Sequence, residues 1–350
     1  MNSASSLLSV VMPTFNGEKY LAAALQSLCA QNDPNLELVI VDDGSSDRTF
    51  EIIASFSQRL AIRLLTPGRL GNWVATTNLG LREARGEWAC LLHQDDLWLP
   101  NRLSRLRPEL DRTDISLLLH NASFIDLKGR VLGPWTCPLA GGLVTPCEFL
   151  ERLLVQNFIA IPSPVFRRKP VVDSGCLDES LWFSADWDLW LRLGALGPIR
   201  FIPEILSSFR VHPTSQTAGR RIGPNEWRQQ LSTVLDRHMP VWQQLLRAEE
   251  SRGGPELGKR RSRRTRNFHR HVERAAEASI AINSGLAALS RGESVAPGSV
   301  LLPLLVLGPA GLRRYLRDSR IVERVGSRLK AKRLNKTPNA QELKPAGVAG

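Results

Sequence analysis

Residues 36–47 read LELVIVDDGSSD, and residues 88–96 read WACLLHQDD. In both stretches a short apolar run ends abruptly in acidic side chains. Apolar runs of about four to eight residues are typical of strands that are buried on both faces of a sheet. We therefore expect two buried strands, one ending at Asp42 and Asp43 and the other at Asp95 and Asp96.

Strands and helices alternate around these two stretches. Apolar runs predict further strands over residues 8–12 and 61–65, and helical spacing of apolar side chains predicts helices over 18–31 and 72–85. This alternation predicts right-handed crossovers and an α/β, Rossmann-like fold, with a mostly parallel central sheet flanked by helices. Ligands of such sheets bind beyond the carboxyl ends of the strands, where both acidic pairs are expected.

The remainder of the chain suggests three regions. A strand at 115–120, a hairpin at 128–129, a helix at 184–196 and strands over 199–210 broken at Pro203 would complete a domain spanning 7–215, with halves 7–110 and 111–215. Residues 225 to about 289 favour helices with a break at 253–255, so we expect a helical basic extension over 225–330. The polar stretch 331–350 is expected to be a disordered tail.

Charge and cysteine content narrow the protein class. Residues 1–246 hold 24 Lys and Arg against 25 Asp and Glu, whereas residues 247–350 hold 22 against 9, so the net charge of +12 comes from the extension. The five cysteines form no Cys-x-x-Cys, which argues against a zinc site or a disulfide framework. Because no apolar run reaches about 18 residues and no basic, apolar leader opens the chain, we expect a cytoplasmic protein.

The acidic side chains allow two interpretations. Carboxylates at a strand end can hold a divalent cation, which prefers oxygen ligands and can share them with a nucleotide diphosphate. Alternatively, Asp95 and Asp96 cap the following helix, and Asp42-Asp43-Gly44 is an ordinary turn. Asp186 and Asp188, at the start of a helix, could equally be acids that favour its dipole. The residues alone leave these interpretations open.

Five motifs occur in a fixed order: PTFN at 13–16, VDDGSSDRT at 41–49, the segment 71–80 bounded by Gly71 and Gly80, ARG at 84–86 and LHQDD at 92–96. In order and spacing they resemble the inverting family-2 glycosyltransferases, which have the nucleotide-diphospho-sugar transferase fold called GT-A. A looser similarity covers residues 184–192 and 209–212. The resemblance therefore spans about residues 8–215.

The resemblance implies roles for individual residues. The nucleotide-binding set would be Pro13, Thr14, Phe15 and Asp43 at the base, Asp95 at the ribose or diphosphate, and Arg210 and His212 near the donor phosphates. Asp96, together with Asp95, would ligate Mg²⁺ or Mn²⁺. Asp186 would be the general base that accepts the proton of the acceptor hydroxyl. For His212, a loop histidine beside Pro213 is the alternative.

The function implied by the resemblance is metal-dependent, inverting transfer of a hexosyl or deoxyhexosyl group. The donor would be a nucleotide-diphospho-sugar and the acceptor a hydroxyl of a glycan or of a lipid-linked sugar, in cell-surface polysaccharide biosynthesis. His93 and Ala185 stand where the family often has Asp and Glu, which keeps open a degenerate GT-A domain that binds nucleotide or glycan without turnover. A dinucleotide-dependent oxidoreductase is disfavoured, since no Gly-x-Gly-x-x-Gly follows the first strand.

The basic extension adds an expected partner. Lys259–Arg266 is the densest basic run, and the apolar run Val300–Leu307 precedes a set of arginines at 313, 314, 317 and 320. Short apolar segments beside basic residues are typical of attachment to anionic membrane surfaces, so we expect peripheral attachment to the cytoplasmic membrane face. The alternative is a helix that packs on the main domain. Nucleic acid is not expected as a partner, because no aromatic interleaving or nucleic-acid module accompanies the run.

Overall fold

The computed structural model describes residues 6–212, 224–251, 255–290 and 294–336. Its strands are β1 (Leu8–Thr14), β2 (Leu36–Asp42), β3 (Ala61–Leu65), β4 (Trp88–Leu91), β5 (Leu97–Trp98), β6 (Leu117–Ile125), β7 (Val131–Trp135), β8 (Gly142–Val144), β9 (Val165–Arg167) and β10 (Ile199–Arg210). Its helices are α1 (Leu21–Cys29), α2 (Thr49–Phe56), α3 (Trp73–Glu83), α4 (Arg102–Leu110), α5 (Pro146–Leu153), α6 (Arg168–Asp173), α7 (Ala185–Leu196), α9 (Pro224–Ser251), α10 (Pro255–Ser290), α11 (Pro297–Val306), α12 (Gly308–Ser319) and α13 (Ile321–Lys336).

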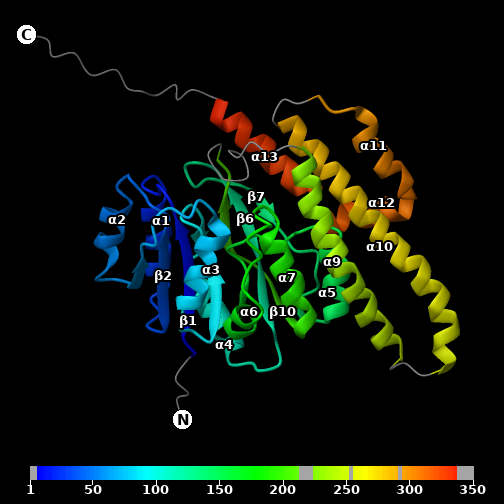
Figure 1. The fold of residues 1–350 in the computed structure, drawn as a ribbon, viewed down its shortest axis with the longest axis horizontal. Helices are drawn as coiled ribbons and strands as arrows, with labels where there is room; N and C mark the ends of the chain where they lie inside the picture. Colours follow the sequence, from blue (N-terminus) through cyan, green and yellow to red (C-terminus); the bar gives the residue numbers. More distant parts are fainter. Residues whose placement is uncertain (1–5, 213–223, 252–254, 291–293, 337–350) are drawn as a thin grey trace, which may run out of the picture.

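The strands form one sheet in the order β3-β2-β1-β4-β9-β6-β10-β5, with β7 on β6 and β8 on β10 (Figure 1). The half from β3 to β4 is parallel throughout. Beyond β4 the sheet is mixed, because β9 runs antiparallel to both β4 and β6, whereas β6 and β10 are parallel. The predicted α/β fold, a central sheet flanked by helices, is confirmed. The prediction that the sheet is mostly parallel is wrong, because five of its nine described strand pairs are antiparallel.

Both faces of the sheet are buried, which is why its inner strands are almost purely apolar. In β1, Val10 and Met12 face one core with helices α1 and α4, whereas Val11 faces a second core with α3, α5 and α7. Successive side chains of a strand point to opposite faces, so one apolar run supplies both cores. The parallel strands β1, β2 and β4 therefore end at one edge, where the acidic residues that follow β2 and β4 lie.

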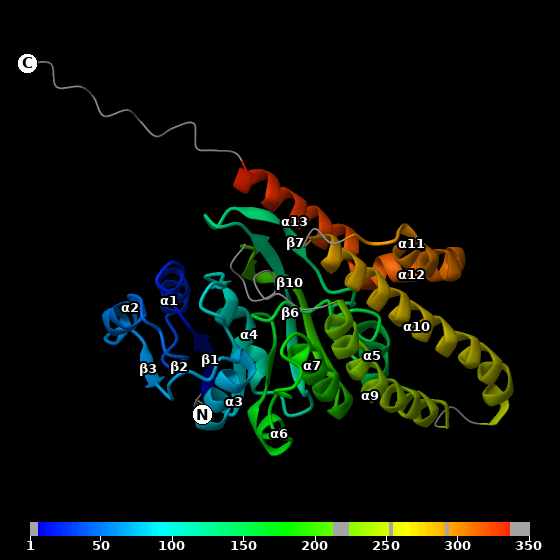
Figure 2. The same ribbon diagram turned by 45° about the horizontal axis from the view of Figure 1, so that its top comes forward.

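The first two helices of the extension pack on the main domain. Helices α9 and α10 lie side by side beyond the end of the sheet that is remote from β3 (Figures 1 and 2). Trp227 and Trp242 of α9 and Val272 of α10 are buried in the second core, with α5 and α7. Helices α9 and α10 therefore pack on the main domain, which was the alternative to membrane attachment for the basic extension.

Two further predictions from the sequence need correction, and one unassigned stretch is now described. Residues 199–210 form one strand rather than two, because shifts of register after Ile202 and Ile205 absorb Pro203. Helix α13 continues to Lys336, beyond the predicted start of the tail at 331; residues 337–350 lie outside the described residues. Residues 134–180, which the sequence left unassigned, contain β8, α5, β9 and α6.

Candidate active site

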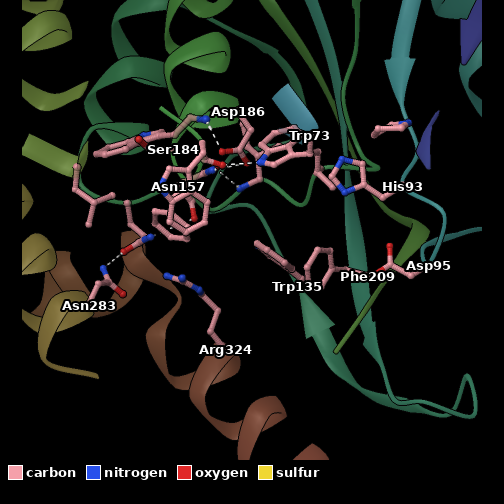
Figure 3. A pocket seen from close by; sticks show the side chains of 18 of the residues that line it. Trp73, His93, Asp95, Trp135, Asn157, Ser184, Asp186, Phe209, Asn283 and Arg324 are labelled. Carbon is pink, nitrogen blue, oxygen red and sulfur yellow. Dashed lines mark hydrogen bonds between the residues drawn. The ribbon is translucent and has the colours of Figure 1, made fainter. Parts of the chain in front are cut away.

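A cavity of about 330 Å³ opens at the carboxyl ends of β1 and β4 (Figure 3). Its wall comes from the strand ends, from loops of the mixed half of the sheet, and from helices α7, α9, α10 and α13. Of the residues predicted to act on substrates, the cavity brings together Pro13, Thr14, Phe15, Asp43, Asp95, Asp186 and His212. It does not bring in Asp96 or Arg210.

The two aspartates after β2 have different partners. Asp42 closes a turn, since its carboxylate accepts hydrogen bonds from the backbone nitrogens of Gly44 (3.1 Å) and Ser45 (2.8 Å). Asp43 lines the cavity, and its carboxylate accepts hydrogen bonds from the Arg69 guanidinium (2.6 Å) and the Gly71 backbone (3.1 Å). Asp43 thereby holds the loop at residues 69–71 over the predicted base pocket.

The opposite side of this pocket is fixed by Gln94, a residue that the sequence analysis did not single out. Its amide oxygen accepts from the Phe15 backbone nitrogen (2.9 Å), and its amide nitrogen donates to the Phe15 carbonyl (3.0 Å). The Arg69 guanidinium lies over the Phe15 ring, 3.6 Å from its centre. The ends of β1 and β4 are thus tied together. The position of Gln94 in the sequence, between His93 and Asp95, was the signal that could have identified it.

Asp95 presents its side chain to the cavity. His212 Nε2 lies 2.7 Å from Asp95 Oδ2, so the structure brings these two predicted donor-binding residues together. Burial opposes ionisation of Asp95, but the His212 hydrogen bond and the nearby His93 outweigh it and lower its pKa. We therefore expect Asp95 to be a carboxylate at neutral pH.

Asp96 turns away from the cavity and is almost completely buried. Its Oδ1 accepts a hydrogen bond from the Arg210 backbone nitrogen (2.9 Å), while Oδ2 has no hydrogen-bond partner among the described residues. Burial, and then the charge of Asp95, raise its pKa well above the ordinary range. The prediction that Asp96 is a principal metal ligand stays a prediction, but in this conformation Asp95 is better placed for that role.

Arg210 is also placed differently from expectation. Its guanidinium is buried and donates to the backbone carbonyls of Asp95 and Asp126, at 2.8 Å in each case. It therefore braces the loop that carries Asp95 and does not line the cavity. The proposed contact of Arg210 with the donor phosphates has no support in this geometry.

The metal donors available on the cavity wall are few. The described part of the chain contains no cluster of three or more His, Cys, Asp and Glu side chains suited to hold an ion. Asp95 offers a carboxylate, and the buried His93 Nε2 has no hydrogen-bond partner among the described residues. Burial lowers the pKa of His93, which keeps the imidazole neutral and able to act as a ligand. Asp95 and His93 would be the protein side chains available to an ion whose remaining ligands are substrate oxygens.

Asp186 lies in the first turn of α7 and lines the same cavity (Figure 3). Its Oδ2 accepts a hydrogen bond from Asn157 Nδ2 (3.0 Å), and its Oδ1 accepts from the Trp187 backbone nitrogen (2.7 Å). Burial raises the pKa of Asp186 to about 6, although these two donors oppose the rise. At neutral pH the group is an ionised, weakly solvated carboxylate, which suits a general base.

The neighbouring Asp188 has a structural role. It is buried and accepts hydrogen bonds from His238 (2.9 Å), Arg237 (2.8 Å) and Arg192 (3.0 Å). Despite burial, these donors lower its pKa to about 2. Because Arg237 and His238 belong to α9, the cluster ties the extension to the helix that carries Asp186.

The C-terminal helices close the cavity, which the sequence analysis did not foresee. Gln156, the neighbour of Asn157, accepts a hydrogen bond from Ser279 Oγ of α10 (2.8 Å), and Asn283 of α10 donates to the same oxygen. Arg324 of α13 lines the cavity, as do the rings of Trp73, Trp135 and Phe209. These residues lie up to about two hundred and fifty positions apart in the chain, so no local motif could reveal them.

Comparisons with known proteins agree with this geometry. Residues 9–134 match the family model "Glycosyl transferase family 2". An uncharacterized glycosyltransferase of Rickettsia typhi is 28% identical over 232 residues, covering 62% of this chain and 67% of the relative. A Haemophilus influenzae glycosyltransferase is 32% identical over 126 residues, covering 35% and 50%. Against a longer Rickettsia conorii relative, the match covers only 35% of that protein.

Among solved structures, residues 1–349 of TarS from S. aureus, in complex with UDP-GlcNAc, share the fold. The TM-score is 0.57 at 18% sequence identity, and the alignment covers 89% of this chain and 92% of that one. The GT-A fold expected from the motifs is therefore confirmed. The additional C-terminal helices are present as well. The family match at residues 9–134 and the relatives named glycosyltransferases support a family-2 glycosyltransferase.

Proposed function

We propose that this glycosyltransferase is an inverting enzyme that uses Asp186 as its single base. The observation that carries the proposal is the presence of the Asp186 carboxylate in one cavity with the nucleotide-side residues Phe15, Asp43 and Asp95. An acceptor hydroxyl bound at Asp186 can attack the anomeric carbon from the face opposite the diphosphate. That displacement inverts the configuration and needs no covalent intermediate.

The proton moves late in this reaction. A carboxylate with a pKa of about 6 is a far weaker base than a sugar alkoxide, so it accepts the proton as the new bond forms. The hydrogen bonds from Asn157 and the Trp187 backbone orient the carboxylate. Holding donor and acceptor in line supplies much of the remaining reduction of the barrier.

The donor is proposed to be a nucleotide-diphospho-sugar of a hexose or deoxyhexose. The TarS structures with UDP and with UDP-GlcNAc support this class of donor. Phe15 and the loop held by Asp43 would contact the base, and Asp95 with His93 would hold Mg²⁺ or Mn²⁺. When bound, such an ion offsets the charge that develops on the leaving diphosphate. The proposed acceptor is a hydroxyl of a glycan or a lipid-linked sugar, in cell-surface polysaccharide synthesis.

A thermal-shift panel of nucleotide sugars with and without Mn²⁺ tests the donor, because a ligand that binds only the folded state raises its melting temperature. The donor found in this way is then used to follow release of the nucleoside diphosphate and the anomeric configuration of the product by NMR. Inverted product supports the proposal. Retained configuration, or binding with no release, contradicts it; binding alone is the behaviour of the degenerate domain that His93 and Ala185 keep open.

We also propose that the enzyme works at the cytoplasmic face of a membrane. No helix in the described chain combines the length and the apolar character that crossing a bilayer requires. Helix α11, however, leaves large apolar side chains exposed at Leu301 (56%), Leu302 (61%), Leu305 (75%) and Val306 (65%). Exposed Arg313 and Arg317 on the following α12 complement an anionic surface. Helix α10 contains residues 259–266, whose side chains lie outside the described residues.

Sedimentation with vesicles of phosphatidylglycerol and phosphatidylcholine tests this surface. The double variant Leu302→Glu, Leu305→Glu should stay in the supernatant, since it places two charges on the proposed lipid-facing side. Val131→Glu is the matched control, because Val131 is 71% exposed but lies on β7. Equal sedimentation of all three proteins, or failure of the unmodified protein to sediment, contradicts the proposal.

A further inference from the structure

The C-terminal extension contributes to one side of the cavity. Helix α10 contributes Ser279, Ile280 and Asn283, and α13 contributes Arg324. In Figure 3, Arg324 and Asn283 lie at one side of the view, whereas His93 and Asp95, the nucleotide side, lie at the other. The extension lies outside the family match at residues 9–134. Its side of the cavity is therefore suited to contact the acceptor.

The charges on the cavity wall are unequally distributed. Among the described residues that line the cavity, Arg324 is the single lysine or arginine, beside the acidic Asp43, Asp95 and Asp186. Asp43 is paired with Arg69 and Asp95 with His212. Arg324 thus supplies a permanent positive charge on the side remote from the expected diphosphate.

The backbone that carries Arg324 is anchored on the main domain. The adjacent Glu323 accepts a hydrogen bond from Thr136 Oγ1 (2.9 Å) and forms an ion pair with Arg320 (3.2 Å). Lys330, further along α13, donates to the Leu132 carbonyl (3.2 Å). Glu323 therefore fixes α13 against the loop after β7, while the next residue reaches the cavity.

A guanidinium binds phosphate and carboxylate through paired, charge-assisted hydrogen bonds. We propose that Arg324 binds an anionic group of the acceptor, a phosphate or a carboxylate, while the acceptor hydroxyl reaches Asp186. The ring faces of Trp135 and Phe209, which pack edge-to-face with centroids 5.2 Å apart, supply apolar surface in the same cavity. The inference rests on the proposed function, because it takes Asp186 as the base, and it narrows the acceptor to a negatively charged one.

Matched acceptors test the inference: methyl glucoside, methyl glucuronide and methyl glucoside 6-phosphate. Each is titrated by calorimetry into full-length protein saturated with nucleoside diphosphate and Mn²⁺. We expect at least one charged compound to bind about tenfold or more tightly than the neutral one, and Arg324→Gln to abolish that preference. The carboxylate and phosphate compounds distinguish the two anionic sources. Arg247→Gln, on the exposed surface of α9, should behave as the unmodified protein does.

Three results would overturn the inference. The charged and neutral compounds could bind with equal affinity, or none of them could bind measurably. Arg324→Gln could keep the preference. Arg324→Gln could instead weaken nucleotide-sugar binding in the absence of any acceptor, which would place the guanidinium at the donor. Failure of the proposed function is recognised separately, since then the unmodified protein would bind no nucleotide sugar, or would bind one without releasing the nucleoside diphosphate or with retained configuration of the product.

Discussion

The hydrogen bond from Asn157 to Asp186 leads to a quantitative prediction about pH dependence. Burial raises the pKa of Asp186 to about 6, and the Asn157 amide opposes that rise. A hydrogen bond to a charged group contributes about 1.5–3 kcal/mol, and about 1.4 kcal/mol corresponds to one pKa unit. Replacing Asn157 by Leu should therefore raise the pKa of Asp186 from about 6 to about 7–8.

The measurement is kcat/KM for nucleoside diphosphate release between about pH 5 and pH 9, where the profile reports the free enzyme. The base must be ionised, so activity falls as pH drops through the pKa of Asp186. The acidic limb should lie near pH 6 in the unmodified enzyme and move upward in Asn157→Leu, while the plateau at high pH is largely retained. Asn283→Leu is the matched control, since Asn283 donates to Gln156 and not to Asp186.

Two results would contradict the role of Asn157 in setting the pKa of Asp186. The acidic limb of Asn157→Leu could stay near pH 6, which would mean that Asp186 is not the titrating base. Alternatively, the Asn283→Leu limb could move as far as that of Asn157→Leu, which would mean that the shift reports a general loosening of the cavity.

Three further predictions concern stability and metal binding. Asp186→Asn should stabilise the fold by roughly 2–3 kcal/mol at pH 8, because at that pH the folded protein must hold an ionised carboxylate whose pKa burial has raised. The gain should vanish below about pH 4, where Asp186 is protonated in both the folded and the unfolded state. Denaturant unfolding at the two pH values checks the sign. Gly194→Ala should destabilise the fold by about 1–3 kcal/mol, because a Cβ there would lie 2.3 Å from the Phe149 ring. Gly326→Ala should leave stability unchanged, because a Cβ there would have no atom within 4 Å. Chemical denaturation compares the two variants, and equal unfolding midpoints would contradict this packing effect. Asp95→Asn should weaken Mn²⁺-dependent nucleotide-sugar binding about tenfold or more, and Asp96→Asn should weaken it less. Calorimetry measures both affinities. A larger loss in Asp96→Asn than in Asp95→Asn would make Asp96 the principal metal ligand.

The sequence predicted the parallel half of the sheet and its acidic edge, because both follow from local patterns. The apolar runs of β1, β2 and β4 end in polar turns, and parallel strands that end together must bring Asp43 and Asp95 to one edge. Asp186 was predicted from its resemblance to the family motif, and it does line the cavity. These features depend on residues that are neighbours in the chain.

What could not be predicted depends on contacts between distant segments. Whether Asp95 or Asp96 faces the cavity is decided by the Arg210 backbone nitrogen, which donates a hydrogen bond to the Asp96 carboxylate. Arg210 lies more than one hundred residues further along the chain. Asn157 and Arg324 become relevant only once α7, α10 and α13 are packed. Helices α9 and α10 were foreseen, but a helical pattern does not say which surface its apolar face covers.

The central claim is that Asp186 is the base and that it acts on a donor bound elsewhere in the cavity. It is tested most directly by comparing turnover and donor affinity in Asp186→Asn. We expect kcat to fall by about 10²–10⁴-fold, while the dissociation constant of the nucleotide sugar stays within about twofold, since Asp186 lies on the acceptor side. Turnover that survives the substitution, or donor affinity that falls in parallel with kcat, would contradict it.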